Sequence, residues 1–74
     1  MKSVQIKLSE AEKVKHFVNI VTKYDFDVDL RSGRFVVDAK SILGLFSLDL
    51  SKPITVEAHS DDCAVFLEEI KAFM

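Results

Sequence analysis

The chain has 74 residues, a formal net charge of −2 and a hydrophobic content of 49%, which predicts one domain over residues 1–74 with a small core. Its single cysteine excludes an internal disulfide and fits a reducing cytoplasm, and no Cys/His pair has zinc-site spacing, so we expect no metal and no cofactor. The weak negative charge gives no reason to expect nucleic acid or an anionic membrane surface, and no apolar run approaches the ~20 residues of a membrane span.

The first third of the chain predicts a strand followed by a helix. Over residues 2–8 the apolar side chains of Val4, Ile6 and Leu8 alternate with polar ones, as in a half-buried strand. The sequence Ser9-Glu10-Ala11-Glu12 then has the pattern of a capping box, which opens a helix. The apolar residues of this helix recur at core spacing: Val14, Phe17, Val18 and Val21, flanked by Ala11, Ile20 and Tyr24.

A hairpin is predicted next. Apolar and acidic side chains alternate over residues 25–30, residues 31–34 are typical of a tight turn, and residues 35–38 return as a third strand. The acidic residues share one strand face: Asp25, Asp27 and Asp29. Paired acids can perform acid–base chemistry, but no pocket residue or metal-ligand partner accompanies them, so a solvated face is favoured. The same acids argue against an RNA-binding sheet, which needs basic and aromatic side chains.

A short helix is predicted from Ser41 to near Asp49. Its apolar side chains occupy well over half of the helix circumference: Ile42, Leu43, Leu45, Phe46 and Leu48. A helix lying on a core needs an apolar stripe only somewhat wider than ~100°. We therefore expect Leu45 and Leu48, with Ile42 beside them, to face the core. The remaining two apolar side chains, Leu43 and Phe46, then point outward.

Ser41 occupies the N-cap position of this helix, where its hydroxyl can accept a hydrogen bond from an amide of the first turn. The outward apolar side chains lie next to it. A capping serine beside surplus apolar surface predicts a docking face that can be switched.

The last third predicts a loop over residues 51–53, a strand and a final helix. The inward face of the strand is Ile54, Val56 and Ala58. Ser60 is predicted to cap the helix, with Asp61 and Asp62 placed favourably against the helix dipole. The helix stripe is Cys63, Phe66, Leu67, Ile70 and Phe73, so Cys63 is expected to be a small core residue. The order βαββαβα predicts an open-faced α/β sandwich, and the ferredoxin-like fold is the other common solution.

The segment from Lys40 to Leu48 resembles the second helix of HPr, the small phosphocarrier of the bacterial sugar phosphotransferase system. The resemblance extends back through residues 22–30 and the Ser32-Gly33 turn, and it covers the middle half of the chain. It implies an α+β, HPr-like open-faced sandwich with a four-stranded antiparallel sheet and three helices on one face.

The family carries its phosphate on a histidine at the start of the first helix, within a Gly-Leu-His-Ala-Arg-Pro type motif. Counting back without gaps from Lys23, Glu10 stands in place of the histidine, Glu12 of the arginine and Lys13 of the proline. Two carboxylates would repel a phosphoryl donor, so the resemblance implies a non-catalytic relative that lacks the acceptor histidine. His16, in the second helical turn, is favoured as a surface residue over an alternative acceptor. His59 receives no role.

Ser41 matches the family serine that an ATP-dependent kinase phosphorylates in many Gram-positive bacteria. The resemblance thus implies a regulatory module in carbon-catabolite control, not an enzyme, whose partners are a serine kinase/phosphatase and a transcriptional regulator. The predicted partner-binding residues are Ile42, Leu43, Phe46, Glu10 and Glu12. Weak self-association through the exposed Leu-Phe pair is a further expectation. Three alternatives stay open: Ser41 only caps its helix, the chain is a working phosphocarrier with a displaced acceptor, or it is an orphan domain without phosphorylation.

Overall fold

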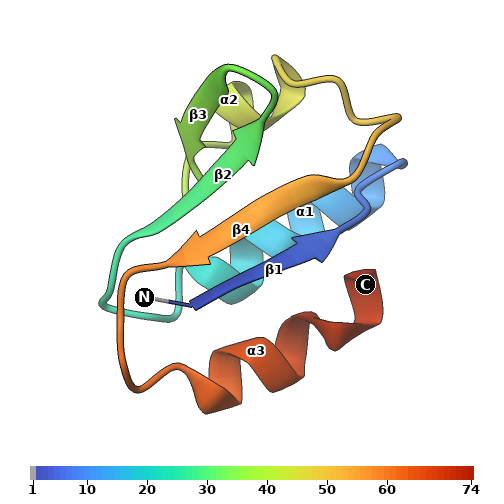
Figure 1. The fold of residues 1–74 in the computed structure, drawn as a ribbon. Coiled ribbons are helices and arrows are strands. Elements are labelled where there is room, and N and C mark those ends of the chain that lie inside the picture. Colours follow the sequence, from blue (N-terminus) through green and yellow to red (C-terminus); the bar gives the residue numbers. More distant parts are fainter. Residues whose placement is uncertain (1) are drawn as a thin grey trace.

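The computed structural model describes residues 2–74. Its helices and strands follow in the order β1 (Lys2–Ile6), α1 (Ala11–Val21), β2 (Val28–Ser32), β3 (Phe35–Asp38), α2 (Ile42–Phe46), β4 (Ile54–Ala58) and α3 (Ala64–Ile70), with a short 3-10 turn over Lys71–Phe73. This confirms the βαββαβα order (Figure 1).

The strands form one antiparallel sheet in the order β1-β4-β2-β3. The central strand β4 pairs with β1 and β2, so Val56 lies opposite Val4 on one side and Leu30 on the other. Strand β3 pairs only with β2 and forms one edge of the sheet, with α2 running behind it (Figure 1).

Only one face of the sheet is buried, because successive side chains of a strand point to opposite faces. Val28 and Leu30 of β2 are fully buried, whereas Asp29 between them belongs to the open face. The buried side chains of the sheet and of all three helices form one hydrophobic core, which confirms the open-faced sandwich. Cys63 lies in this core as a free cysteine, as predicted. No helix within residues 2–74 has the length and apolarity needed to cross a membrane.

The predicted capping of α1 and α3 is wrong. The N-cap of α1 is Glu10, and its side chain makes no capping hydrogen bond. The first helical hydrogen bond runs from the Val14 N–H to the Glu10 carbonyl, so the helix starts one residue later than a capping box with Ser9 as the N-cap requires. Helix α3 begins after Cys63, because the Ser60 hydroxyl accepts the Asp62 N–H (3.1 Å) and forms a local turn instead. The two acidic residues after Ser60 therefore precede the helix and lie outside its first turn.

Two elements are shorter than predicted, and one is displaced. Strand β1 ends at Ile6, because the Lys7 N–H leaves the sheet and donates to the Phe73 carbonyl (2.7 Å). Strand β2 is displaced along the chain: it runs from Val28 to Ser32, so Asp25 and Asp27 precede it, and Arg31 and Ser32, predicted in the turn, belong to the strand. Helix α2 ends at Phe46, and the chain continues through turns to a loop in which Asp49 binds Ser51.

Candidate functional site

Ser41 is the N-cap of α2, as predicted. Its Oγ accepts the Gly44 N–H (3.2 Å) and its carbonyl accepts the Leu45 N–H (3.1 Å). Its own N–H donates to the Asp38 carbonyl (3.0 Å), which anchors the start of the helix to the end of β3. The side chain is exposed. Ser41 is thus fixed by both backbone and side chain while its hydroxyl remains open to solvent.

Gly44 allows α2 to pack closely against its own cap and against β3. A Cβ on Gly44 would lie 3.3 Å from the Ser41 Oγ and 3.4 Å from the Val37 Cβ. Both separations are at the tight limit of van der Waals contact. The glycine therefore holds the capping serine and the edge strand together.

The apolar side chains of α2 divide as the sequence predicts. Leu45 is fully buried, and Ile42 is half-buried against the core. Leu43 is 82% exposed and Phe46 is 45% exposed, so both point away from the core. We call Ile42, Leu43 and Phe46 the α2 patch. It is contiguous in sequence with Ser41.

A network of polar contacts ties the segment before α2, and helix α3, to the turn that follows α1. The Lys40 Nζ donates to the Tyr24 carbonyl (3.0 Å), and the Tyr24 hydroxyl donates to Glu69. The Lys23 Nζ pairs with the same carboxylate at 2.8 Å. Hydrogen bonds from Lys23 and Tyr24 lower the pKa of Glu69, whereas the bond to Glu69 raises the pKa of Tyr24.

The start of α1 presents two exposed carboxylates, Glu10 and Glu12. Glu12 lies in the first turn, where a negative charge is favourable against the helix dipole. No hydrogen bond or ion pair within residues 2–74 joins either side chain to the α2 patch, although α1 and α2 pack against each other.

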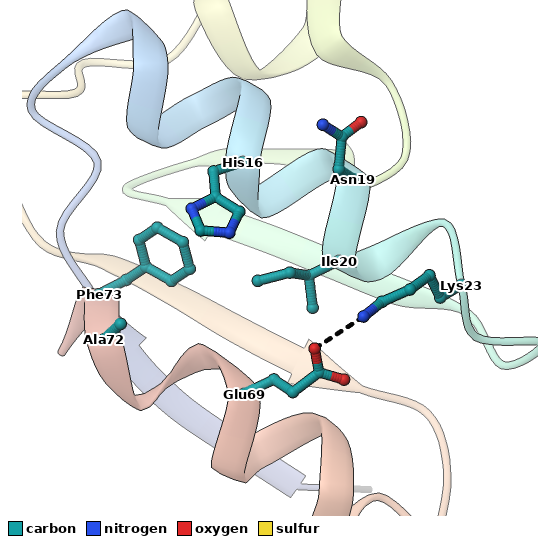
Figure 2. Close-up of a pocket in the computed structure, with 7 residues that line it drawn as sticks. All are labelled: His16, Asn19, Ile20, Lys23, Glu69, Ala72 and Phe73. Atoms are coloured by element: carbon teal, nitrogen blue, oxygen red, sulfur yellow. Dashed lines mark hydrogen bonds and ion pairs between the residues drawn. The ribbon is translucent and has the colours of Figure 1, made fainter.

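His16 lies on an exposed part of α1, facing a cavity of about 320 Å³ between α1 and the C-terminal helical turns (Figure 2). Its ring meets the ring of Phe73 edge-on, with centroids 5.7 Å apart. The Lys23–Glu69 ion pair spans the cavity at its other end (Figure 2). Sequence reasoning missed this cavity. Only one side of the cavity has a sequence signal, the i, i+4 spacing of His16 and Ile20 on α1 with Lys23 just after the helix; the other side comes from α3 and the C-terminal turn and has none.

The open face of the sheet carries a second polar cluster that the sequence did not reveal. The His59 Nε2 lies 2.8 Å from the Asp29 Oδ2, across the boundary between β4 and β2. Asp27 and Asp38 line the same depression, of about 450 Å³. Within residues 2–74, no group of three or more His, Cys, Asp or Glu side chains is placed to hold a metal ion.

The four-stranded antiparallel sheet with three helices on its buried face defines the class of small open-faced sandwich to which phosphocarrier proteins belong. The family model described as the PTS HPr component phosphorylation site matches residues 6–74. The chain belongs to this HPr family of the phosphotransferase system, whose members bind protein partners of that system.

Two solved structures illustrate the similarity. The crystal structure of HPr-C-His from Thermoanaerobacter tengcongensis has a TM-score of 0.78 and 25% identity, and the match covers 97% of this chain and 93% of that one. The crystal structure of a phosphocarrier protein HPr from Bacillus anthracis str. Ames has a TM-score of 0.76 and 29% identity, and the match covers 96% of this chain and 90% of that one. No curated protein matches the sequence.

Proposed function

We propose that the chain is a regulatory HPr relative that binds protein partners through the α2 patch and is switched by phosphorylation of Ser41. The observation that carries this proposal is the exposed Ser41 hydroxyl at the N-cap of α2, adjacent in sequence to the half-buried Ile42 and the exposed Leu43. A kinase can reach the hydroxyl, and a partner that covers the patch is placed to sense the change in charge.

Phosphorylation at this position alters the charge of the docking face more than the fold. A phosphate adds about −1.5 to −2 charge and three strong acceptor oxygens at pH 7. The Gly44 N–H, which now binds the Ser41 Oγ, can bind a phosphate oxygen instead. The positive end of the helix dipole favours the added charge. The apolar side chains of the patch keep their exposure, so the modification changes which partner is attracted.

Glu10 and Glu12 support a role other than phosphate transfer at the start of α1. The gap-free alignment places Glu10 at the position of the family's acceptor histidine, and a carboxylate there repels a phosphorylated donor. Both side chains are exposed at the helix N-terminus. We assign them to the partner-binding surface, where they would face basic side chains.

The first experiment is the intact mass of the protein after incubation with ATP and an HPr serine kinase. We expect the mass of one phosphate to be added to wild type and to Ser47→Ala, but not to Ser41→Ala. Ser47 is the matched control, because it is an exposed serine at the opposite end of the same helix. Absence of phosphate from all three proteins, or its presence on Ser41→Ala, contradicts the proposal.

A second candidate is a working phosphocarrier with His16 as a displaced acceptor. It is favoured by the exposure of the His16 ring beside a cavity. It requires a mass gain that depends on phosphoenolpyruvate and enzyme I, is abolished by His16→Ala and is lost in acid, since phosphohistidine is acid-labile and phosphoserine is not. A chain that takes up phosphate by neither route would be an orphan member of the family.

A further inference from the structure

The face of the sheet that carries the core extends past the end of α2. Val37 of β3 lies on this face, since it packs against the core and lies beside Gly44 of α2. Phe35 is two residues earlier on the same strand, so its side chain projects from the same face. Helix α2, however, ends at Phe46, and Phe35 is 69% exposed. Within residues 2–74, an aromatic side chain on the core face is therefore left largely uncovered.

This uncovered end of the sheet borders a depression of about 400 Å³ between the β2–β3 turn and the loop after α2. Small-molecule sites range over about 300–1,000 Å³. Ser32 also lines the depression, and it pairs with Phe35 across the hairpin, so both side chains face the same side of the sheet. The Ser32 hydroxyl has no hydrogen bond within residues 2–74. The depression thus combines an exposed aromatic ring with a free hydroxyl.

The same depression carries uncompensated positive charge. Arg34 lines it, is exposed, and makes no ion pair within residues 2–74. Lys52 approaches Asp49 only to 3.9 Å, and both of these side chains are exposed. The Asp49 carboxylate is held in its own loop, where it accepts the N–H and the hydroxyl of Ser51, and these hydrogen bonds lower its pKa. Two cations therefore line the depression beside one carboxylate that is already engaged, in a chain whose net charge is −2.

We propose that this depression binds a nucleoside monophosphate. The base stacks on the exposed ring of Phe35, because aromatic side chains bind bases through their π-faces. The phosphate binds to Arg34 and Lys52, and the planar guanidinium of Arg34 can donate to two phosphate oxygens at once. The hydroxyl of Ser32, on the same face as Phe35, is placed to bind the ribose.

The other depressions of the molecule lack this combination. The cation of the cavity beside His16 is Lys23, and its charge is already paired with Glu69 at 2.8 Å. The depression on the open face of the sheet is lined by three aspartates and one histidine, which repel a phosphate. The weak negative charge of the whole chain also disfavours a nucleic-acid polymer, so the ligand is a free mononucleotide.

The site is separate from the proposed phosphorylation site. Ser41 caps the N-terminal end of α2, whereas Ser47, which borders the depression, is the C-cap of the same helix. The unmodified chain is therefore expected to bind the nucleotide. A chain that takes up no phosphate at Ser41 would leave this inference unchanged.

Calorimetric titration of the full, unmodified chain with adenosine monophosphate tests the proposal. We expect saturable binding with a dissociation constant in the millimolar range or below. Adenosine, which lacks the phosphate, and inorganic phosphate, which lacks the ring, should each bind at least about tenfold more weakly. In amide NMR spectra the nucleotide should shift the resonances of residues 32–35 and 47–52, and it should leave those around His16 unchanged.

Two variants separate the ring from the charge. Phe35→Leu removes the stacking surface and Arg34→Gln removes a cation, and each should weaken binding of adenosine monophosphate about fivefold or more. Phe35→Tyr keeps the ring and should bind like wild type. Lys15→Gln removes an equal charge from an exposed position on α1 and should also bind like wild type. Both Arg34 and Phe35 are exposed, so these variants should fold, which circular dichroism checks.

Three results would overturn the proposal. The first is the absence of binding at millimolar nucleotide. The second is inorganic phosphate that binds as tightly as adenosine monophosphate, or Phe35→Leu that binds like wild type, since either would show that the ring contributes nothing. The third is an equal loss of affinity in Lys15→Gln and Arg34→Gln, which would reduce the binding to general charge attraction.

Discussion

The N-termini of α1 and α2 are built in opposite ways. Helix α1 has 11 residues and no side-chain cap, yet it places Val14, Phe17, Ile20 and Val21 in the core. Helix α2 has five residues, buries only Leu45 within its own span, and begins at a serine that caps it through Oγ. A long helix is held by its packed face, whereas an isolated short helix is marginal and depends on its cap. The proposed switch, Ser41, is therefore also the side chain that stabilises the start of α2.

The largest effect is expected when the packed face of α1 is removed. Phe17 is fully buried and its ring meets that of Phe73 edge-on. Phe17→Ala should lower the free energy of unfolding by about 3–5 kcal/mol. For so small a domain this is comparable with the whole stability, so most molecules should be unfolded. Urea denaturation followed by circular dichroism measures this. The exposed neighbour Lys15→Ala is the control and should change little.

Removing the cap of α2 should have an intermediate effect. Ser41→Ala should cost about 1 kcal/mol, because the Gly44 N–H loses its partner. Ser41→Asp should retain most of the stability, since aspartate is an equally good N-cap. Glu10→Ala, at the uncapped start of α1, should change the free energy of unfolding by less than about 0.5 kcal/mol. Equal costs for Ser41→Ala and Glu10→Ala in urea denaturation would contradict the contrast between the two helix starts.

The opposite end of α1 supplies a smaller, pH-dependent contribution. Hydrogen bonds from Lys23 and Tyr24 lower the pKa of Glu69 in the folded state. Because this pKa is lower in the folded than in the unfolded state, the carboxylate stabilises the fold at pH values above its unfolded-state pKa, near 4.3. That stabilisation is lost as the pH falls through the folded-state pKa. The Tm of wild type should therefore exceed that of Glu69→Gln at neutral pH, and the difference should shrink in acid. If the Tm difference between wild type and Glu69→Gln were the same at pH 7 and pH 3, the ionised carboxylate would contribute nothing to stability.

Much of the fold follows from side-chain periodicity. Strict alternation located β4, and helical spacing correctly assigned Leu45 to the core and Leu43 to the surface. The starts of α1 and α3 were misplaced because Ser9 and Ser60 fit capping patterns in the sequence, whereas the N-caps in the structure are Glu10 and Cys63. Ser60 instead closes a local turn with Asp62. A hydroxyl can satisfy either geometry, and only the tertiary structure decides between them.

The polar clusters could not be predicted, because they join residues far apart in sequence. His59 and Asp29 are 30 positions apart and meet only because β4 pairs with β2. The Lys23–Glu69 pair is separated by 46 positions and requires α1 and α3 to lie side by side. In contrast, Ser41 and its exposed neighbour Leu43 belong to one short helix. This is why the α2 patch was accessible from the sequence and the cavity beside His16 was not.

The smallest effect on stability, and the most informative for function, is expected at Leu43. Its side chain is 82% exposed, so Leu43→Ser should change the free energy of unfolding by less than about 0.5 kcal/mol. A partner that covers the α2 patch would lose a buried apolar contact, and its affinity should fall about tenfold or more.

Calorimetric titration of the phosphorylated chain with a candidate transcriptional regulator measures this loss of affinity. Val65→Ser, on an apolar side chain of α3 that is also largely exposed (69%), is the matched control and should bind like wild type. Equal losses in both variants would indicate general apolar adhesion, and no loss at Leu43 would remove the patch from the interface. A selective loss at Leu43 with unchanged stability would separate docking on α2 from the folding role of its cap.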